Sequence, residues 1–273
     1  MRIGSRQFDL ENECYIMGIL NVTPDSFSDG GKWNNIDAAL RHAEEMISEG
    51  CDIIDIGGES TRPGHEKITD EEETERVVPV IREIKKRFDV PVSLDTYKSR
   101  VASAGVEAGA DLINDIWGCK YEKSMADVMA QADVPVVLMH NRSNADYDDY
   151  FMQFKTELGE CVSIALAAGV KEENIILDPG IGFGKTCEQN LQLMNNLTIM
   201  NTLGSKEKSF PWLLGASRKS MIGLTLDLPA DQRLEGTLVT TVFGVAAGCS
   251  IVRVHDIKEN LRAVKMAKAI LKS

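Results

Sequence analysis

Short apolar runs alternate with longer amphipathic segments along the whole chain. The short runs are rich in β-branched residues, and apolar side chains in the longer segments recur at the spacing of a helix. The eight runs begin at Tyr15, Asp52, Pro91, Asp111, Pro135, Asn174, Trp212 and Ser250. The eight helical segments span residues 36–49, 70–88, 97–108, 123–131, 150–168, 188–197, 234–247 and 258–271. This order predicts repeated strand–helix units.

The fold class predicted by this pattern is α/β, as a single (β/α)8 barrel, or TIM barrel, in one domain over residues 1–273. Continuous apolar runs are typical of strands that are buried on both faces, as they are in such a barrel. No Ser-rich or Pro-rich linker divides the chain. A doubly wound open sheet is the structural alternative.

Two local signals mark the helix over residues 70–88. Thr69 and Glu72 have the spacing of a capping box, in which each side chain binds the backbone amide of the other residue. Pro79 lies in the middle of the segment and has no amide hydrogen, so a kink or a break is expected there.

Each apolar run becomes polar towards its C-terminal end, where the strands of a parallel barrel surround one mouth. These polar residues are Asn21, Thr61, Arg62, Asp95, Asn114, His140, Asp178, Lys219, Arg253 and His255. Because side chains alternate along a strand, Met17, Ile19 and Asn21 share one face. The same alternation groups Ser93 with Asp95, Ile176 with Asp178, and Ile251 with Arg253 and His255. If these faces point inward, the last residue of each group lines the mouth.

The polar strand ends combine hydrogen-bond acceptors with cations. Asp95, Asp178 and the amide of Asn114 can bind a flat heterocycle, because a carboxylate meets adjacent N–H and amino groups with two parallel hydrogen bonds. Alternatively, each of these side chains satisfies a loop amide. The cationic candidates, which can bind phosphate or remain solvated or ion-paired, are Arg62, Lys219, Arg253 and His255.

The formal net charge of -12 restricts the possible partners. Its field repels phosphate polymers, so we expect no nucleic-acid partner and no membrane partner, and an anionic ligand needs a local cluster of cations. No apolar stretch approaches a membrane span, and no signal-peptide core follows Met1, so a cytoplasmic location is expected. The six cysteines are scattered without a CxxC pair, which indicates free thiols rather than a zinc site.

The stretch GIGFGKT at residues 180–186 has some features of a phosphate-binding P-loop. The spacing does not fit, because Gly180 lies one residue too close to Gly184, Lys185 and Thr186. The glycines at positions 180, 182 and 184 instead predict a turn that brings the backbone close to a ligand beside Asp178.

Seven stretches of the sequence carry a resemblance to a known family. In order they are MGILNVTPDSFSDGG, DIGGESTRPG, SLDT, LINDI, ILDPGIGFGKT, GASRKS and RVHD, and they cover essentially the whole chain. They resemble the motifs of the dihydropteroate synthase family. One departure is MHNRSN at residues 139–144, which leaves the contacts of that loop open.

The resemblance implies a (β/α)8 barrel that acts in folate biosynthesis. Such an enzyme condenses 6-hydroxymethyl-7,8-dihydropterin pyrophosphate with p-aminobenzoate to give 7,8-dihydropteroate and pyrophosphate. The resemblance also implies Mg2+ as the cofactor and a homodimer as the assembly. Two alternatives are a methyltetrahydrofolate-binding methyltransferase of related fold and a pterin-binding protein without turnover.

The same resemblance implies roles for individual residues. For the pterin it implies contacts with Asp95, Asn114, Ile116, Met139, Asp178, Lys219 and Arg253. For the pyrophosphate it implies Asn21, which is also the expected Mg2+ ligand, with Arg62, Arg253 and His255. For p-aminobenzoate it implies Thr61, Pro63, Phe183 and Ser220. The residues expected to be catalytic are Asn21, Arg62, Asp95, Lys219, Arg253 and His255.

The chemistry of the reaction agrees with these roles. An arylamine is a weak nucleophile, so we expect the C–O bond to pyrophosphate to break early and the amine to capture the pterin methyl cation. Cations with Mg2+ then stabilise the departing charge. The segment 21–31 is longer than a usual strand–helix connection, so we expect it, with Asp29, to close over the pterin and exclude water.

Overall fold

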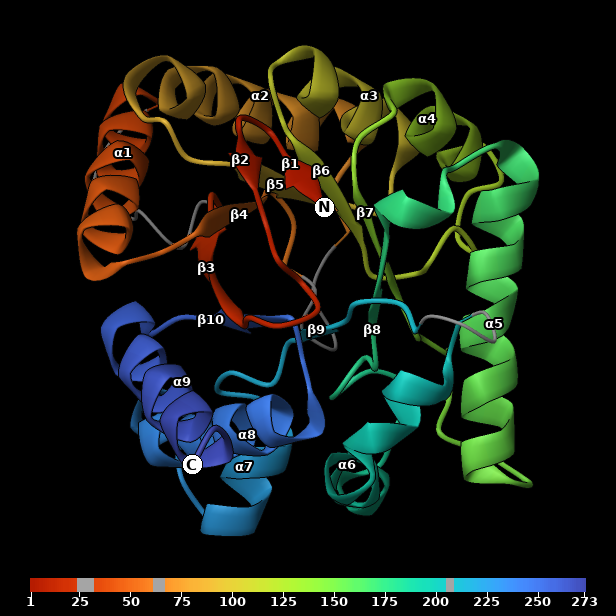
Figure 1. Cartoon of the computed structure of the whole chain (residues 1–273). Helices are drawn as coiled ribbons and strands as arrows, with labels where there is room; N and C mark the ends of the chain where they lie inside the picture. Colours follow the sequence, from red (N-terminus) through yellow and green to blue (C-terminus); the bar gives the residue numbers. More distant parts are fainter. Residues whose placement is uncertain (24–31, 61–66, 205–208) are drawn as a thin grey trace.

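Eight parallel strands form a barrel that is surrounded by helices (Figure 1). The computed structural model describes residues 1–23, 32–60, 67–204 and 209–273, without the side chains of residues 32–35. Asp29, Thr61, Arg62 and Pro63 lie outside the described residues, so the roles expected for them stay predictions.

The barrel strands follow the order of the chain. They are β3 (Tyr15–Asn21), β4 (Ile53–Gly57), β5 (Val92–Asp95), β6 (Leu112–Asp115), β7 (Val136–Met139), β8 (Ile175–Asp178), β9 (Leu213–Leu214) and β10 (Ile251–Val254). Hydrogen-bonded neighbours run in the order β8-β7-β6-β5-β4-β3-β10-β9. A parallel bridge between Leu177 and Trp212 brings the two edges of this sheet together. The barrel prediction is therefore confirmed, and the alternative of an open doubly wound sheet is wrong.

The eight predicted helices are present and lie outside the strands (Figure 1). They are α1 (Lys32–Glu49), α2 (Asp70–Arg87), α3 (Ser99–Glu107), α4 (Met125–Ala132), α5 (Tyr150–Ala168), α6 (Cys187–Asn195), α8 (Leu234–Ala247) and α9 (Ile257–Leu271). The sequence pattern does not predict α7 (Ser220–Leu226), because its 7 residues are too few to show a helical period. Short 3-10 turns occur at η2 (Glu172–Asn174), η3 (Leu197–Thr202) and η4 (Ala230–Gln232).

Helix α2 confirms the predicted capping box and excludes a break, but not a kink, at Pro79. Glu72 N donates to Thr69 Oγ1 over 3.1 Å and Thr69 N donates to Glu72 Oε2 over 3.0 Å, so the capping box is present. The helix runs through Pro79 without interruption, so the expected break is absent. Val77 and Ile81 are buried against the barrel, and this packing offsets the hydrogen bond that proline cannot make.

Side chains on the strands alternate between two cores, as their parity predicts. The core inside the barrel contains Met17, Ile53, Leu112, Val137, Ile176, Leu213 and Ile251. The core between strands and helices includes Ile16, Ile54 and Leu94. Met17, Ile176 and Ile251 thus point inward as expected. Residues two or four positions further along the same strands therefore face the mouth.

A short hairpin closes the N-terminal end of the barrel, opposite the mouth. Strand β1 (Arg2–Ile3) pairs antiparallel with β2 (Arg6–Gln7). Ile3, Phe8 and Leu10 belong to the core inside the barrel, and the Phe8 ring lies 4.7 Å from the Tyr15 ring. The sequence does not predict this hairpin, because strands of two residues show no alternation.

Two further expectations concern the membrane and the thiols. In the part of the chain that the structure describes, no helix is long and apolar enough to cross a membrane. All six cysteines are free, including Cys14 and Cys249, whose Sγ atoms lie 3.6 Å apart. The prediction of free thiols is therefore confirmed.

Candidate active site

A row of residues from neighbouring strands crosses the C-terminal mouth of the barrel. Asn21 of β3 is opposite Gly57 of β4 in the parallel register. Gly57 is in turn opposite Asp95 of β5, and Asp95 is opposite Asn114 of β6. A Cβ atom placed on Gly57 would lie 3.7 Å from both Asn21 Oδ1 and Asp95 Cβ. The amide oxygen of Asn21 and the carboxyl group of Asp95 therefore both lie close to Gly57 at the rim.

Arg253 of β10, the strand next to β3, continues this row into the mouth. Its Nε donates to Asp55 Oδ2 over 2.5 Å, and its Nη2 donates to Asp95 Oδ2 over 2.6 Å. Asn114 Nδ2 donates to the same Asp55 oxygen over 3.2 Å. Only 17% of the Arg253 side chain is exposed, so the guanidinium group has a fixed orientation inside the mouth.

Asp55 is a site residue that is not among the candidates from the sequence. It lies in the middle of β4 rather than at its end, so the pattern of polar strand ends does not include it. Its parity could have identified it, because Asp55 alternates with the inward residues Ile53 and Gly57. A fully buried carboxylate in an apolar strand is itself a signal of a polar partner nearby.

Two buried carboxylate oxygens in this cluster can still accept a hydrogen bond. Oδ1 of Asp55 and Oδ1 of Asp95 have no hydrogen-bond partner among the described residues. Burial raises the pKa of Asp95 to about 7, although the positive charge of Arg253 acts to lower it. Burial acts to lower the pKa of Arg253, but Asp55 and Asp95 hold it above its ordinary value. The cluster is thus built around a permanent cation and offers acceptors to a ligand.

Asp178 of β8 lies beside Arg253 on the far side of the same mouth. A Cβ atom placed on Gly215 would lie 3.5 Å from Asp178 Oδ2 and 4.0 Å from Arg253 Cδ. Asp178 Oδ1 accepts a hydrogen bond from Gly180 N over 2.7 Å. Burial raises the pKa of Asp178, against the effects of the Gly180 amide and the charges of Lys219 and Arg253.

Lys219 lies beside apolar side chains of the mouth, and its charge interacts with that of Asp178. Its Nζ donates to Ile181 O over 2.7 Å and lies 4.0 Å from the centre of the Phe183 ring. Burial lowers the pKa of Lys219 to about 8, whereas the charge of Asp178 acts to raise it. Phe183 packs with Ile116 and Met139 in a small apolar cluster that also contains Tyr97 and Trp117. Ser220, the first residue of α7, is exposed next to Lys219.

His255 lies just beyond Arg253, after the end of β10. Its Nδ1 is 3.0 Å from Ser217 Oγ, and its backbone N donates to the same oxygen over 3.2 Å. The neighbouring Arg218 donates from Nε to Asp256 Oδ2 over 3.1 Å and from Nη2 to Asp256 Oδ1 over 2.5 Å. These contacts fix the connection after β9 to the end of β10.

A buried ionic cluster that the sequence does not point to lies beside the end of β4. Lys98 Nζ is 2.6 Å from Glu59 Oε2 and 2.8 Å from Glu73 Oε2, and it donates to Ile68 O over 2.7 Å. Tyr97 OH donates to Glu59 Oε1 over 2.6 Å. Lys98 thus holds a residue before and a residue after the segment 61–66, in which three site candidates lie.

The rim can accommodate a divalent cation at Asn21. Among the described residues no group of three or more His, Cys, Asp or Glu could hold a metal ion by itself. Mg2+ does not need such a group when a substrate supplies phosphate oxygens, because one or two protein oxygens with water complete its shell. Asn21 Oδ1, next to Asp95 across Gly57, is an oxygen of the required kind.

The glycine-rich stretch after β8 forms the predicted turn. Gly180, Gly182 and Gly184 have φ values of 67°, 85° and 52°, which other residues rarely adopt. Lys185 is directed into the turn and donates to the carbonyl oxygens of Gly180 and Phe183. The lysine is therefore part of the turn itself, unlike the lysine of a P-loop, which reaches towards phosphate.

Comparisons with known proteins agree with this geometry. Residues 17–255 match the family model described as "Pterin binding enzyme". A dihydropteroate synthase of Clostridium beijerinckii is 59% identical over 273 residues, which covers 100% of both chains. The chain belongs to the dihydropteroate synthase family. The resemblance noted in the sequence motifs is thereby confirmed, and the dihydropteroate synthase family comprises transferases of folate biosynthesis.

Solved structures of dihydropteroate synthases have the same fold. One from Clostridium difficile, in the presence of pteroic acid, has a TM-score of 0.94 and 48% identity, covering 98% of this chain and 100% of that one. One from Xanthomonas albilineans, with 4-aminobenzoic acid, has a TM-score of 0.90 and 39% identity, covering 96% and 94%. Membership of the dihydropteroate synthase family favours the synthase over the methyltransferase alternative.

The described site candidates come together at one end of the barrel. They are Asn21, Asp95, Asn114, Ile116, Met139, Asp178, Phe183, Lys219, Ser220, Arg253 and His255. His140 is different, because it follows the inward Met139 and is directed away from the mouth towards Glu157 of α5. The expectation that this polar strand end lines the mouth is therefore wrong for His140.

Proposed function

We propose that the chain condenses 6-hydroxymethyl-7,8-dihydropterin pyrophosphate with p-aminobenzoate to form 7,8-dihydropteroate and pyrophosphate. The observation that carries this proposal is the buried cluster of Arg253 with Asp55 and Asp95, beside Asp178. It places acceptors for a flat nitrogen heterocycle and a permanent cation in one mouth. Full-length similarity to dihydropteroate synthases supports the same reaction.

The pterin ring is proposed to bind among Asp95, Asn114 and Asp178. The unpartnered Oδ1 of Asp95 and the Oδ2 of Asp178 can accept from ring N–H and amino groups. Lys219 can donate to a ring acceptor, and the plane of Arg253 can stack on the ring. Ile116 and Met139, buried in the apolar cluster, suit the uncharged face of the heterocycle.

p-Aminobenzoate is proposed to bind near Phe183, on the side of Lys219 and Ser220. The Phe183 ring offers an apolar surface for the arene, and the adjacent Lys219 supplies positive charge near the carboxylate. Thr61 and Pro63 complete the expected contacts, and Lys98 holds the residues on both sides of their segment. The amine then points into the mouth, towards the pterin.

Pyrophosphate is proposed to bind between Asn21 and the C-terminal end of β10. Arg253 and His255, with Arg62, supply positive charge to an otherwise acidic chain. Asn21 provides the oxygen for Mg2+, which when bound neutralises charge on the departing pyrophosphate. Closure of the segment 21–31 with Asp29 is part of the proposal, as a way to exclude water that would capture the cation.

The proposed reaction is dissociative. The C–O bond between the pterin methylene and the pyrophosphate breaks, and its electron pair leaves with the pyrophosphate. The lone pair of the arylamine then forms the C–N bond, and the nitrogen loses a proton. The protein acts by holding both substrates in line and by placing Arg253 and His255 next to the developing negative charge, so no covalent link to the enzyme is needed.

The assembly is proposed to be a homodimer through α7 and α8, which contact each other. Both helices expose large apolar side chains, which are Leu224, Leu226, Val239, Val242 and Phe243. Such a surface is typical of an interface between subunits. A cytoplasmic location is also proposed, because six free thiols, two of them in contact, suit a reducing compartment.

A two-substrate assay tests the proposed reaction. Release of pyrophosphate should require both the pterin pyrophosphate and p-aminobenzoate, and should fall when Mg2+ is removed. Dihydropteroate should form in equal amount. Binding of the pterin without any release of pyrophosphate would instead support the alternative of a pterin-binding protein without turnover.

A further inference from the structure

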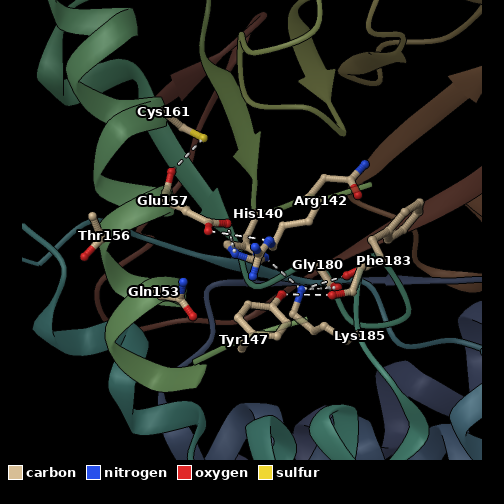
Figure 2. A network of polar contacts seen from close by, with 12 residues as sticks. His140, Arg142, Tyr147, Gln153, Thr156, Glu157, Cys161, Gly180, Phe183 and Lys185 are labelled. Atoms are coloured by element: carbon tan, nitrogen blue, oxygen red, sulfur yellow. Dashed lines mark hydrogen bonds and ion pairs between the residues drawn. The ribbon is translucent and has the colours of Figure 1, made fainter. Parts of the chain in front are cut away.

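A half-buried lysine, Lys185, lies at the centre of the turn between β8 and α6 (Figure 2). Lys185 Nζ donates to Gly180 O over 2.9 Å and to Phe183 O over 3.0 Å, and it lies 2.9 Å from His140 Nδ1. An ammonium group has three donors and no acceptor, so these three partners occupy all of its donors. Burial lowers the pKa of Lys185 to about 7, whereas the charge of Asp178 acts to raise it, and in the ammonium form no donor remains for a substrate.

His140 is the acceptor that completes this arrangement. Burial lowers the pKa of His140 to about 2, and the positive charge of Lys185 acts in the same direction, so the ring is neutral. Because Nδ1 accepts from the ammonium, the ring hydrogen is on Nε2. Nε2 lies 3.2 Å from Glu157 Oε2 of α5, and neither atom has a hydrogen-bond partner among the described residues. The carboxylate therefore favours the tautomer that Lys185 needs through its negative charge, and not through an aligned hydrogen bond.

The turn packs tightly against the residues that follow β7. A Cβ atom placed on Gly180 would lie 1.9 Å from His140 O, and one on Gly184 would lie 2.8 Å from both Cβ and O of Arg142. Tyr147 OH donates to Gly184 O over 2.8 Å, and the guanidinium carbon of Arg142 lies 4.2 Å from the centre of the Tyr147 ring. His140 and Arg142 belong to the atypical MHNRSN loop and Tyr147 follows it, so this part of the chain supports the turn on the side away from the mouth.

The front of the same turn carries groups that face the active site. Phe183 is the residue whose carbonyl oxygen Lys185 holds, and its ring faces Lys219 Nζ. Ile181 O, between the two carbonyls held by Lys185, accepts the hydrogen bond of Lys219. A displacement of the turn therefore moves the Phe183 ring and a hydrogen-bond acceptor of Lys219 together.

We propose that Lys185, oriented by His140 and Glu157, is a positioning residue for p-aminobenzoate. It fixes the Phe183 ring and, through Ile181 O, the ammonium group of Lys219, so that the arylamine is held in line with the pterin methylene. This inference rests on the proposed place of Phe183 in the p-aminobenzoate pocket. It assigns a role in substrate selection to a side chain that touches no substrate.

The decisive variant is Lys185→Met, which keeps the length of the side chain and removes the three donors. The KM for p-aminobenzoate should rise by about tenfold, because small misplacements of a bound reactant have large effects. The KM for the pterin pyrophosphate should rise by a smaller factor, since Asp95 of β5 makes no contact with the turn, although Asp178 accepts a hydrogen bond from Gly180 N. Equal increases in the two constants would overturn the proposal in favour of a general structural role.

The matched control is Lys85→Met, at the other end of the barrel. Lys85 is partly buried and lies 2.6 Å from Asp111 Oδ2, so its removal also costs an ion pair. We expect both KM values of this variant to stay at the wild-type level. A selective effect of Lys85→Met on p-aminobenzoate would show that the assay responds to any lost lysine, and would overturn the proposal.

Phe183→Ala separates this inference from the proposed function. If Phe183→Ala leaves the KM for p-aminobenzoate unchanged, the proposed pocket is wrong and the inference fails with it. If Phe183→Ala raises that KM but Lys185→Met does not, only the inference is wrong. In the double variant Lys185→Met/Phe183→Ala the effects should be less than multiplicative, because both act on the same ring.

A milder variant serves if Lys185→Met does not fold. Glu157→Gln removes the charge that selects the His140 tautomer and leaves Lys185 in place, and it should raise the KM for p-aminobenzoate by about threefold. Glu160→Gln, at an exposed position of the same helix, is its control and should have no effect. Identical constants for Glu157→Gln and Glu160→Gln would overturn the proposal.

Discussion

Arg253 of β10 and Asp55 of β4 form an ion pair inside the mouth, past the intervening strand β3, with 2.5 Å between Nε and Oδ2. The side chain of Asp55 is 0% exposed, and Arg253 contacts Asp95 at the same time. A guanidinium group with two carboxylates has little rotational freedom. The pair therefore sets the orientation of the residue that is proposed to meet both pterin and pyrophosphate.

Asp55→Asn should damage activity and stability together. The variant leaves the guanidinium group with one carboxylate partner, so we expect a loss of about 3 kcal/mol in the free energy of unfolding. We also expect kcat/KM to fall by about 100-fold, because Arg253 is no longer held in place. Urea denaturation and steady-state kinetics measure the two effects. The control Asp133→Asn, in an exposed pair with Lys171, should cost less than about 1 kcal/mol.

Asp178→Asn should weaken binding of the pterin by at least about 1–3 kcal/mol. An amide in this position presents a donor to a ring that needs acceptors, so one hydrogen bond is lost and a donor is left facing another. Titration calorimetry with the pterin substrate measures the change. Equal affinity of the variant and the wild type would remove Asp178 from the pterin site.

Lys219 should make stability depend on pH in the alkaline range. Burial lowers its pKa from 10.5 to about 8, so between these values the unfolded chain binds more protons than the folded one. The free energy of unfolding should therefore rise with pH from about 8 upward, relative to Lys219→Met, by about 1 kcal/mol per pH unit. Urea denaturation of both proteins across this range gives the difference. A difference that stays constant with pH would contradict the lowered pKa.

Gly180→Ala should destabilise the turn that carries Phe183. Its Cβ would lie 1.9 Å from His140 O, and the φ of 67° is itself unfavourable for alanine. We expect a loss of more than about 2 kcal/mol in the free energy of unfolding. Gly159→Ala is the matched control, because a Cβ on this residue of α5 meets nothing within 4 Å. That variant should gain about 0.5–1 kcal/mol.

Phe243→Asp should convert the proposed homodimer into a monomer. Phe243 is 52% exposed on α8, and a carboxylate in an apolar interface cannot be satisfied there. Light scattering after size-exclusion chromatography measures the molar mass. Met266→Asp, at an exposed position on α9, should leave the mass unchanged. A wild-type protein that is monomeric would contradict the proposed assembly.

The strands and the row across the mouth could be predicted because they depend on local alternation. In β5 and β8 an apolar strand ends in a carboxylate two positions after an inward residue, so parity alone places Asp95 and Asp178 in the mouth. The helices were predictable for a similar reason, since their apolar faces cover the strands.

The remaining features depend on contacts that are distant in sequence. Asp55 meets Arg253 from a position 198 residues away in the sequence, and no local pattern relates the two. Lys98 and Lys185 have the same residue type as solvated lysines, and only tertiary packing surrounds them with acceptors. The parity of His140 indicates a side chain that points away from the mouth, because it follows the inward Met139. Its place at a polar strand end led to the opposite prediction.

The hairpin at the base of the barrel constrains the time course of folding. Ile3 and Phe8 belong to the same core as Ile251, and Tyr15 N donates to Ser250 O over 2.9 Å. These early residues leave the ribosome long before their partners have been synthesised. The core that they enter also contains Leu213 and Ile251, so it cannot be completed until translation is almost finished. Chaperone binding near this end of the nascent polypeptide would protect it during that interval.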